Sequence, residues 1–283
     1  MCPRFVAKSY IVNTDNEKSN DLFELDLDMP FSVAIVTQDE EDRLPDCLES
    51  VSFADEIVVV DSGSQDNTIG IARSFGCKVL KETWRGYARQ KQFAVDSCTN
   101  DWVLILDSDE KIPDETARKI KELLASNEHH FAACSFLRKN FFHNRWIRHC
   151  GWWPDRIVRL VDRRRGRFSN HLVHESWVSE GLVKNLGVNI EHRSFRNYSD
   201  LIHKLETYST LAAQEMLRDG KYAGPLSPLF HGIWMFLRTY ILELGILEGF
   251  DGFIISTLNG GGSFMKYAKL REAKVYGRSL RKK

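Results

Sequence analysis

The sequence predicts an α/β protein with a mostly parallel central sheet flanked by helices and a C-terminal helical extension. Three observations support this class. Short apolar runs alternate with amphipathic segments between Phe31 and Ala125, and this order favours parallel strands joined by right-handed crossovers. Apolar helical segments follow Ser199 and are interrupted at Gly224-Pro225. A chain of 283 residues, 43% hydrophobic and 28% charged, is ordinary for a globular protein.

The first half of the chain alternates four predicted strands with four predicted helices. The predicted strands are Phe31–Val36, Glu56–Val60, Lys78–Leu80 and Trp102–Leu106. The predicted helices are Leu44–Val51, Thr68–Phe75, Ala88–Asp96 and Asp114–Leu124. Ligands of such sheets bind at the carboxyl ends of the strands. The polar residues that follow each strand are therefore the first candidates for a site.

The second half predicts further strands and then helices. Short mixed segments are typical of antiparallel strands that complete the sheet: Ala132–Phe142, Arg156–Val161, Leu172–Val178 and Leu182–His192. The predicted helices that follow are Asp200–Arg218, Leu229–Leu247 and Phe264–Tyr276. The chain then divides into a loosely ordered acidic arm over residues 1–29, an α/β domain over 30–195 and a helical region over 196–283.

Bulk composition excludes several classes of protein. The 39 basic and 39 acidic residues cancel, which argues against a nucleic-acid partner. Six cysteines without a CxxC pair argue against a zinc site or a disulfide framework. No secretory signal is visible, and Arg238, Glu243, Glu248 and Asp251 interrupt the best candidate for a membrane span. A cytoplasmic protein is expected, with contact at a membrane surface left open.

Three carboxylates follow the strand that ends at Leu106. Asp107, Asp109 and Glu110 lie within four positions, and neighbouring carboxylates repel one another unless a cation or a ligand compensates their charge. Mg²⁺ or Mn²⁺ meets this need, because such ions bind through one or two carboxylates and the phosphates of a substrate. An acidic helix start is the alternative, but it explains only Asp114. The motif therefore predicts a divalent metal site.

A second polar turn follows the strand that ends at Val60. Asp61 stands where a carboxylate can accept a hydrogen bond from a nucleoside base or a ribose hydroxyl. Gly63 permits the tight turn, and Asp66 or Asn67 can cap the next helix. The alternative interpretation is a well-capped loop between a strand and a helix, which is common in α/β proteins.

The two motifs, in this order after the opening strand Val33–Thr37, resemble the inverting family-2 glycosyltransferases, which have a GT-A nucleotide-sugar-binding fold. The resemblance runs from Phe31 to about His192. It implies that Asp107-Ser108-Asp109 is the DxD motif of the family, with Asp109 on a divalent metal and Asp107 near the ribose. It also implies that Thr37, Glu40 and Asp61 line the nucleoside pocket. Lys91 is implied to approach the nucleotide.

A closer resemblance continues beyond these motifs. The segments Trp153–Arg164, His171–Glu175 and Lys266-Tyr267 are similar to the lipopolysaccharide core β-glucosyltransferases. This similarity implies transfer of a sugar, glucose from UDP-glucose, to a hydroxyl of a lipopolysaccharide core or a related surface glycan. An acceptor on polyprenyl phosphate or another lipid carrier is the alternative. The enzyme would then work in the cytoplasm, with peripheral contact to the cytoplasmic face of the inner membrane.

Glu175 is the expected general base. The acceptor hydroxyl must lose its proton as it attacks the anomeric carbon, and a carboxylate within hydrogen-bond reach can take that proton. His174 receives a supporting role, because a histidine at the end of an apolar strand is more often structural than catalytic. Trp153, Asp155 and Arg156 are the expected acceptor contacts.

Two further segments permit two interpretations each. The segment from Arg138 to Arg167 contains ten basic residues and only two acidic ones. This composition fits a solvated surface, or a site for an anionic glycan or the leaving diphosphate. The segment Leu229–Leu247 is apolar on more than one face. It fits packing against the sheet or contact with a membrane surface.

Two other functions compete with sugar transfer. A nucleotidyltransferase also uses carboxylates and a metal at strand ends, but it is expected to have a glycine-rich basic loop after the first strand. The segment Thr37–Asp42 has neither feature. A non-catalytic, membrane-associated scaffold with the same fold is the third possibility. The presence together of Asp61, Asp107, Asp109 and Glu175 argues against it.

Overall fold

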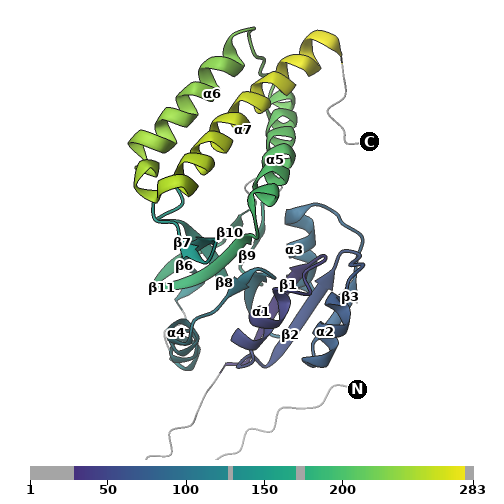
Figure 1. Cartoon of the computed structure of the whole chain (residues 1–283). Helices are drawn as coiled ribbons and strands as arrows, with labels where there is room; N and C mark the ends of the chain where they lie inside the picture. The colour runs from purple at the N-terminus through teal and green to yellow at the C-terminus, as the bar shows by residue number, and fades with distance from the viewer. Residues whose placement is uncertain (1–28, 127–129, 170–175, 278–283) are drawn as a thin grey trace, which may run out of the picture.

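The computed structural model describes residues 29–126, 130–169 and 176–277 (Figure 1). It contains a nine-stranded mixed sheet with flanking helices, a separate two-stranded sheet of β9 and β10, and a three-helix extension. The expected arm over residues 1–29 lies outside the described residues except for Met29. The strands are β1 Phe31–Thr37, β2 Glu56–Asp61, β3 Lys78–Lys81, β4 Trp102–Asp107, β5 Glu110–Lys111, β6 Phe131–Phe142, β7 Arg145–Trp146, β8 Arg156–Asp162, β9 Gly166–Phe168, β10 Trp177–Ser179 and β11 Leu182–Phe195. The helices are α1 Leu44–Ser50, α2 Thr68–Ser74, α3 Tyr87–Asp96, α4 Asp114–Ala125, α5 Tyr198–Arg218, α6 Ser227–Leu237 and α7 Gly249–Tyr276.

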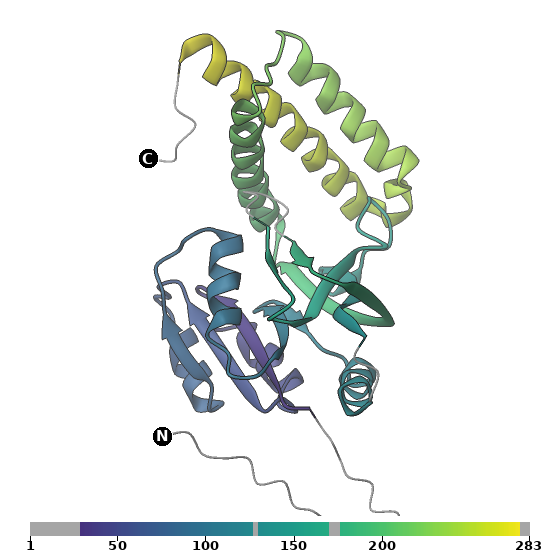
Figure 2. The ribbon, with the colours of Figure 1, turned by 180° about the vertical axis from the view of Figure 1, so that it is seen from behind.

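The first half of the sheet is parallel, as expected. Strands β3, β2, β1 and β4 lie side by side in that order. Alternate residues of β1 face opposite sides, so Val33 and Ile35 pack with α1, α2 and α4, whereas Ala34 packs with α3. Figure 2 shows α3 on the face turned away from the viewer of Figure 1. Covering both faces explains why these strands are almost continuously apolar.

The second half of the sheet differs from the expected antiparallel arrangement. Strand β8 does run antiparallel to β4 and β6. Strand β11, however, pairs parallel with β6, which corrects the expectation. The partner of a strand depends on contacts between distant segments, and the apolar pattern of β11 carries no information about direction.

The far end of the sheet curls back to the end of β4. Strand β5 begins at Glu110, three residues after β4 ends at Asp107, yet it pairs with β11 at the opposite end of the strand order. A link this short spans only about 10 Å. The sheet therefore has to curl, and His192 of β11 comes to lie opposite Glu110.

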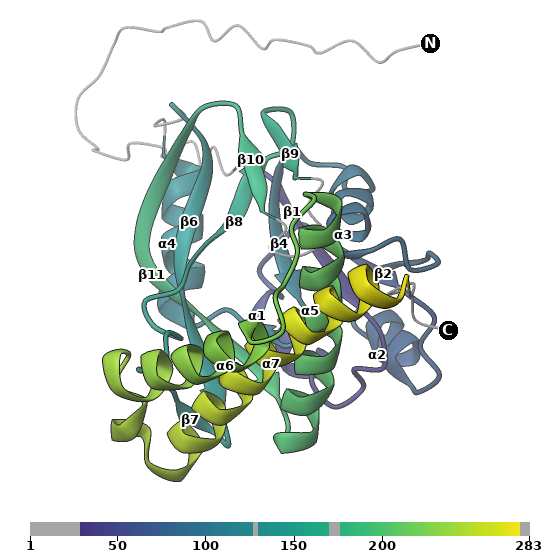
Figure 3. The ribbon, with the colours of Figure 1, turned by 90° about the horizontal axis from the view of Figure 1, so that it is seen from above.

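The C-terminal region consists of α5 and a helical hairpin formed by α6 and α7 (Figures 1 and 3). The expected single helix Leu229–Leu247 is wrong. Helix α6 ends at Leu237, and the chain reverses through a π turn, Arg238–Leu242, and a 3₁₀ turn, Gly245–Glu248. The expected helix start at Phe264 is also wrong, because α7 already begins at Gly249. Over the described ranges, no helix is long and apolar enough to cross a membrane.

Glycines allow the two helices of the hairpin to approach closely. A Cβ atom on Gly260 would lie 3.0 Å from the carbonyl oxygen of Gly232, and one on Gly232 would lie 3.1 Å from Cβ of Phe264. At the reversal, a Cβ on Gly252 would lie 1.9 Å from the carbonyl oxygen of Gly245. Tertiary packing therefore overrides the poor helix propensity of these glycines.

We expect Gly252→Ala to lower the free energy of unfolding by about 2 kcal/mol or more, because the new methyl group overlaps backbone atoms that cannot move independently. Gly261→Ala is the matched control in the same helix. Its Cβ would meet only Cδ1 of Leu205, at 3.7 Å, so the gain in helix propensity should raise stability by roughly 0.5–1 kcal/mol. Urea denaturation of both variants checks the pair, and equal effects would contradict the close approach.

Candidate active site

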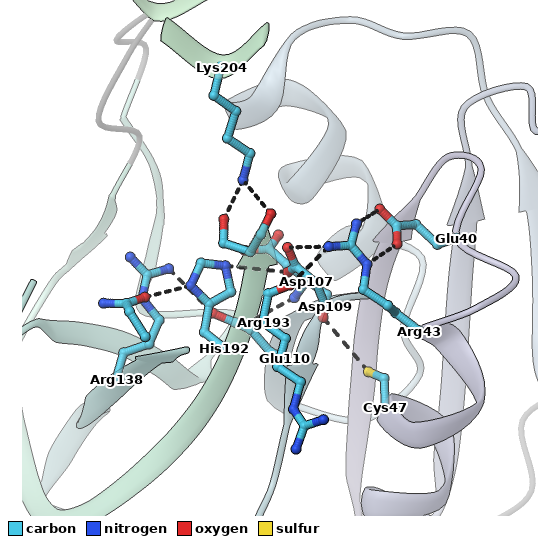
Figure 4. A network of polar contacts seen from close by, with 12 residues as sticks. Glu40, Arg43, Cys47, Asp107, Asp109, Glu110, Arg138, His192, Arg193 and Lys204 are labelled. Atoms are coloured by element: carbon cyan, nitrogen blue, oxygen red, sulfur yellow. Dashed lines mark hydrogen bonds and ion pairs between the residues drawn. The ribbon is translucent and has the colours of Figure 1, made fainter. Parts of the chain in front are cut away.

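Three parallel strands end at one edge of the sheet and bring the predicted polar residues together. Thr37 of β1 lies beside Asp61 of β2, and Val36 lies beside Asp107 of β4. The carboxyl ends of β1, β2 and β4 therefore form one floor, the position where α/β sheets bind ligands. Figure 4 shows the polar side chains that gather around Asp107 and Asp109 at this edge.

Asp61 organises the turn that follows β2. Its buried carboxylate accepts hydrogen bonds from the backbone N–H of Gly63 at 3.0 Å, from the backbone N–H of Ser64 at 3.1 Å and from the Ser64 hydroxyl. Next to it, the buried hydroxyl of Thr37 has no hydrogen-bond partner among the described residues. Buried polar groups are normally satisfied, so the Thr37 hydroxyl is available to a ligand at this floor.

The helix after this turn is capped by Asp66. The carboxylate of Asp66 accepts a hydrogen bond from the backbone N–H of Thr68 at 3.0 Å. Asn67 makes no side-chain capping bond, which decides between the two predicted caps.

Asp107 is held by two cations. Lys91 Nζ lies 2.8 Å from one carboxylate oxygen, and Arg159 Nη2 lies 2.7 Å from the other. Burial alone would raise the pKa of Asp107, but the positive charges of Lys91 and Arg159 outweigh it and hold the pKa well below its usual range. Lys91 and Asp107, both predicted to contact the nucleotide, therefore contact each other.

Glu110 is the third carboxylate of this charge cluster and is buried next to Arg159. Its side chain is fully buried, its carboxylate lies 2.6 Å from Arg159 and 3.4 Å from Arg138, and it accepts the backbone N–H of Asp107 at 3.1 Å. Buried charges are tolerated only when they are paired and hydrogen-bonded. Glu110 thus fixes the end of β4 from below, while Asp109 faces a different set of partners.

Asp109 faces His192 from the curled end of the sheet. Its Oδ1 atom lies 3.4 Å from Nε2 of His192, and its Oδ2 atom lies 3.8 Å from Arg43 (Figure 4). Burial raises the pKa of Asp109, but the His192 imidazole more than offsets this and keeps the pKa below its usual range. The two side chains come from β11 and from the turn after β4, which lie far apart in the sequence.

Asn140 fixes the orientation of the His192 ring. The Asn140 amide nitrogen donates to the Trp152 carbonyl at 3.1 Å and to Asp155 at 3.3 Å, so its oxygen faces Nδ1 of His192 at 2.6 Å. Nδ1 therefore donates its proton to Asn140, and Nε2 points toward Asp109. A proton on Nε2, or a cation bound between Nε2 and the carboxylate, satisfies both groups.

The donor set of Asp109 and His192 fits a divalent cation. A carboxylate oxygen and an imidazole nitrogen are both metal ligands, and a second hydrogen bond that orients the ring is typical of metal-binding histidines. No cluster of three or more His, Cys, Asp or Glu residues is found in the described part of the chain. The remaining ligands would have to be water and phosphate oxygens, as is usual for Mg²⁺.

Two further basic side chains, Lys204 and Arg43, lie near Asp109. Lys204 reaches down from α5 and donates to the carbonyl and the hydroxyl oxygens of Ser194, and burial lowers its pKa. Arg43 is held by a two-point contact with Glu40, and burial raises the pKa of that carboxyl. Glu40, predicted to contact the nucleoside, therefore orients an arginine next to Asp109.

The predicted acceptor residues occupy three different settings. Asp155 lies 2.8 Å from Arg138 and contacts Asn140, so it supports His192 indirectly. The Trp153 ring packs edge-on against Trp146, with centroids 5.0 Å apart. Arg156 is exposed at the start of β8. Glu175 and His174 lie outside the described residues.

The basic block between Arg138 and Arg167 is largely engaged within the protein. Arg163 donates to the carbonyl oxygen of Cys98 at 2.6 Å, Arg164 pairs with Asp162 at 2.8 Å, and Arg145 pairs with Glu248 at 2.6 Å. The structure therefore does not bring these guanidinium groups together as one anion-binding surface.

Sequence reasoning did not single out His192, Lys204 or Arg43. His192 stands at the end of a predicted strand, and the rule that drew attention to Asp61 and Asp107 would also have drawn attention to it. Lys204 lies inside an ordinary amphipathic helix, and nothing local distinguishes it from a solvent-facing lysine.

Comparisons with known proteins agree on one class of enzyme. The sequence profile of glycosyl transferase family 2 matches residues 32–180. A lipopolysaccharide core biosynthesis glycosyltransferase, LpsC of Rhizobium meliloti, is 32% identical over 88% of this chain and 93% of its own length. An uncharacterized glycosyltransferase of Rickettsia typhi is 30% identical over 88% of this chain and 89% of its own length.

Solved structures with a related arrangement are more distant. The mannosyltransferase PcManGT from Pyrobaculum calidifontis, in complex with GDP-Man and Mn²⁺, is 15% identical with a TM-score of 0.49, over 85% of this chain and 86% of that one. TarS of S. aureus, in complex with UDP, is 15% identical with a TM-score of 0.44, over 89% of this chain and 93% of that one.

We expect Arg159→Met to lower the free energy of unfolding by about 3–5 kcal/mol, because it leaves the buried carboxylate of Glu110 without its nearest cation. The matched control is Lys119→Met, whose ion pair with Glu122 is solvent-exposed on both sides. That change should cost no more than about 1 kcal/mol. Guanidinium denaturation measures both. Similar losses for the two variants would show that the cluster under β4 is not a structural requirement.

Proposed function

Because this chain belongs to glycosyl transferase family 2, we propose that it transfers glucose from UDP-glucose to a hydroxyl of a lipopolysaccharide core or a related surface glycan, with inversion at the anomeric carbon. The similarity to LpsC over most of both chains supports this class of acceptor. One observation carries the proposal: Thr37, Asp61, Asp107 and Asp109 lie at one edge of the sheet beside His192.

Thr37 and Asp61 are proposed to bind the nucleoside. The free hydroxyl of Thr37 offers a hydrogen bond on this floor, and the Asp61 carboxylate beside it is anchored by its own turn. Lys91 and Asp107, which form a buried pair, would then act at the nucleotide by holding the end of β4 in place.

Asp109 and His192 are proposed to hold Mg²⁺ or Mn²⁺ together with the diphosphate of the donor. When bound, the metal supplies positive charge to the leaving diphosphate. Arg43 lies 3.8 Å from Asp109, and the charge of Lys204 also acts on this carboxylate. Their charges would stabilise the same developing negative charge without having to move, which is the most effective form of electrostatic catalysis.

Glu175 is proposed to accept the proton of the acceptor hydroxyl. The hydroxyl oxygen bonds to the anomeric carbon as the bond between that carbon and the diphosphate oxygen breaks, and UDP leaves. His174, Trp153 and Arg156 are proposed to contact the acceptor. Asp155 supports the site from behind through Asn140.

Two alternatives predict different behaviour. An enzyme that uses a lipid-linked acceptor would release UDP only with a polyprenyl phosphate or a similar carrier, and a donor and acceptor screen that measures UDP release separates it from a core glycosyltransferase. A non-catalytic scaffold would bind UDP without turnover.

We expect Asp109→Asn to lose at least 100-fold in turnover and to lose metal-dependent binding of UDP, because a neutral amide is a weak ligand for a divalent cation. Asp46→Asn, on the exposed side of α1, is the matched control and should behave as the unaltered protein. UDP release and calorimetric titration of UDP with and without Mn²⁺ measure both effects. Full turnover of the unaltered protein in EDTA would remove the metal from the proposal.

We expect Glu175→Gln to retain UDP affinity but to lose about 10²–10⁴-fold in kcat, because the amide keeps the size of the side chain without the basic oxygen. Single-turnover sugar transfer, UDP titration and the thermal midpoint are measured on the same preparation. If Glu175 only pairs with an arginine, the variant would be less stable and the folded fraction would react at the normal rate.

A further inference from the structure

The face of α6 that points away from the rest of the protein is apolar, whereas the outward face of a helix in water is normally polar. Large hydrophobic side chains recur at helical spacing on this face and are exposed: Leu226, Leu229, Phe230, Ile233, Trp234, Leu237 and Ile241. The side that packs on α7 is lined instead by small residues such as Gly232. Phe230 and Trp234 are 64% and 55% exposed, so packing within this chain does not account for them.

The apolar surface continues around the reversal of the hairpin. Seven more exposed hydrophobic side chains follow between α6 and the first turns of α7: Leu242, Leu244, Ile246, Leu247, Phe250, Phe253 and, further along α7, Phe264. Together with the α6 residues above, we call these the apolar hairpin face. Soluble proteins rarely expose a contiguous apolar area of this kind unless it binds something.

The acidic and basic groups of residues 222–253 are paired within the protein. Arg238 and Glu243 form an ion pair at 2.8 Å. Glu248 is buried and pairs with Arg145 at 2.6 Å. Asp251 accepts from the Tyr198 hydroxyl at 2.8 Å and lies 3.2 Å from Arg145. An unpaired charge would be costly to remove from water, and this segment presents none among its Asp, Glu, Lys and Arg residues.

Basic residues follow the apolar hairpin face along the chain. From Lys266 onward the sequence has eight Lys and Arg residues and one Glu. Of these, Lys274 is exposed near the end of α7, and Tyr267 stacks on His231 of α6 with ring centroids 3.7 Å apart. The basic end of α7 thus lies next to the start of the exposed α6 stripe (Figure 3).

We propose that the apolar hairpin face inserts into the surface of a lipid bilayer that contains anionic lipids, with α6 lying in the plane of the interface. The combination of Trp and Phe on an exposed helix face with nearby basic residues is typical of interfacial helices. Adjacent Lys and Arg residues gain free energy at an anionic surface. A second copy of this chain is the less suitable occupant, because a symmetric dimer pairs this face with the same face and offers its basic residues a like-charged surface rather than an anionic one.

This proposal does not depend on the sugar or the acceptor of the reaction. It does give the active site a fixed relation to the membrane, because α5 carries Lys204 into the site and also packs along α7. A glycan acceptor carried on a lipid would then be presented from the same side as the hairpin.

Co-sedimentation of the full chain with vesicles tests the proposal. We expect binding to vesicles of phosphatidylcholine and phosphatidylglycerol, weaker binding to phosphatidylcholine alone, and at least about a tenfold loss of binding for the double variant Phe230→Glu and Trp234→Glu. Leu182→Glu is the matched control, since Leu182 is 71% exposed on β11. It should bind as the unaltered chain does. Leu229→Gln with Ile233→Gln, on the same face, serves if the first variant does not fold.

Three results would overturn the proposal. The unaltered chain could fail to sediment with anionic vesicles, or the variants of the hairpin face could bind as tightly as the unaltered chain. Sedimentation velocity could also reveal a dimer that the double variant abolishes, which would assign the face to a second copy. None of these measurements uses sugar transfer, so their outcome is separate from that of the proposed function.

Discussion

The concentration of negative charge at the end of β4 is the constraint on which the rest of the structure depends. Asp107, Asp109 and Glu110 are largely buried within four positions, and such a cluster is stable only if cations reach each of them. The compensating groups are supplied by five elements: Lys91 from α3, Arg159 from β8, Arg138 from β6, His192 from β11 and Arg43 at the start of α1. The need to bring these groups together explains why the sheet curls.

The parallel half of the fold could be predicted because its information is local. Buried strands, polar strand ends and helix periodicity can all be recognised within short windows of sequence, so the sequence alone predicts that Asp61 and Asp107 lie at the same edge of the sheet. The parallel pairing of β11 with β6 could not be predicted, because it depends on residues about 50 positions apart. His192 stands at a predicted strand end and could have been noticed, but its position opposite Asp109 depends on the same distant pairing. The bounds of α6 and α7 were predicted wrongly, because Gly252 and Gly260 allow close packing between segments, whereas helix propensities describe isolated helices.

Several residues predicted to contact a ligand also contact one another in the same neighbourhood. Asp155, expected to touch the acceptor, accepts a hydrogen bond from Asn140, which in turn contacts His192. Glu40, expected at the nucleoside, holds Arg43. Residue type and spacing predict that these side chains gather at strand ends, whereas the partner of each one depends on the fold.

The contact between β5 and β11 gives the site an unusual mechanical weakness. These strands pair over only two residues, Glu191 with Lys111 and His192 with Glu110, whereas the other strand pairs that meet at this edge, β1 with β2 and with β4, extend over six. A ladder this short opens locally at lower free energy than the rest of the sheet. A ligand held by both Asp109 and His192 ties the two sides together and shifts that opening equilibrium by mass action. Such a ligand would bind the closed form of the sheet most tightly, and the edges of β5 and β11 would separate less often while it is bound.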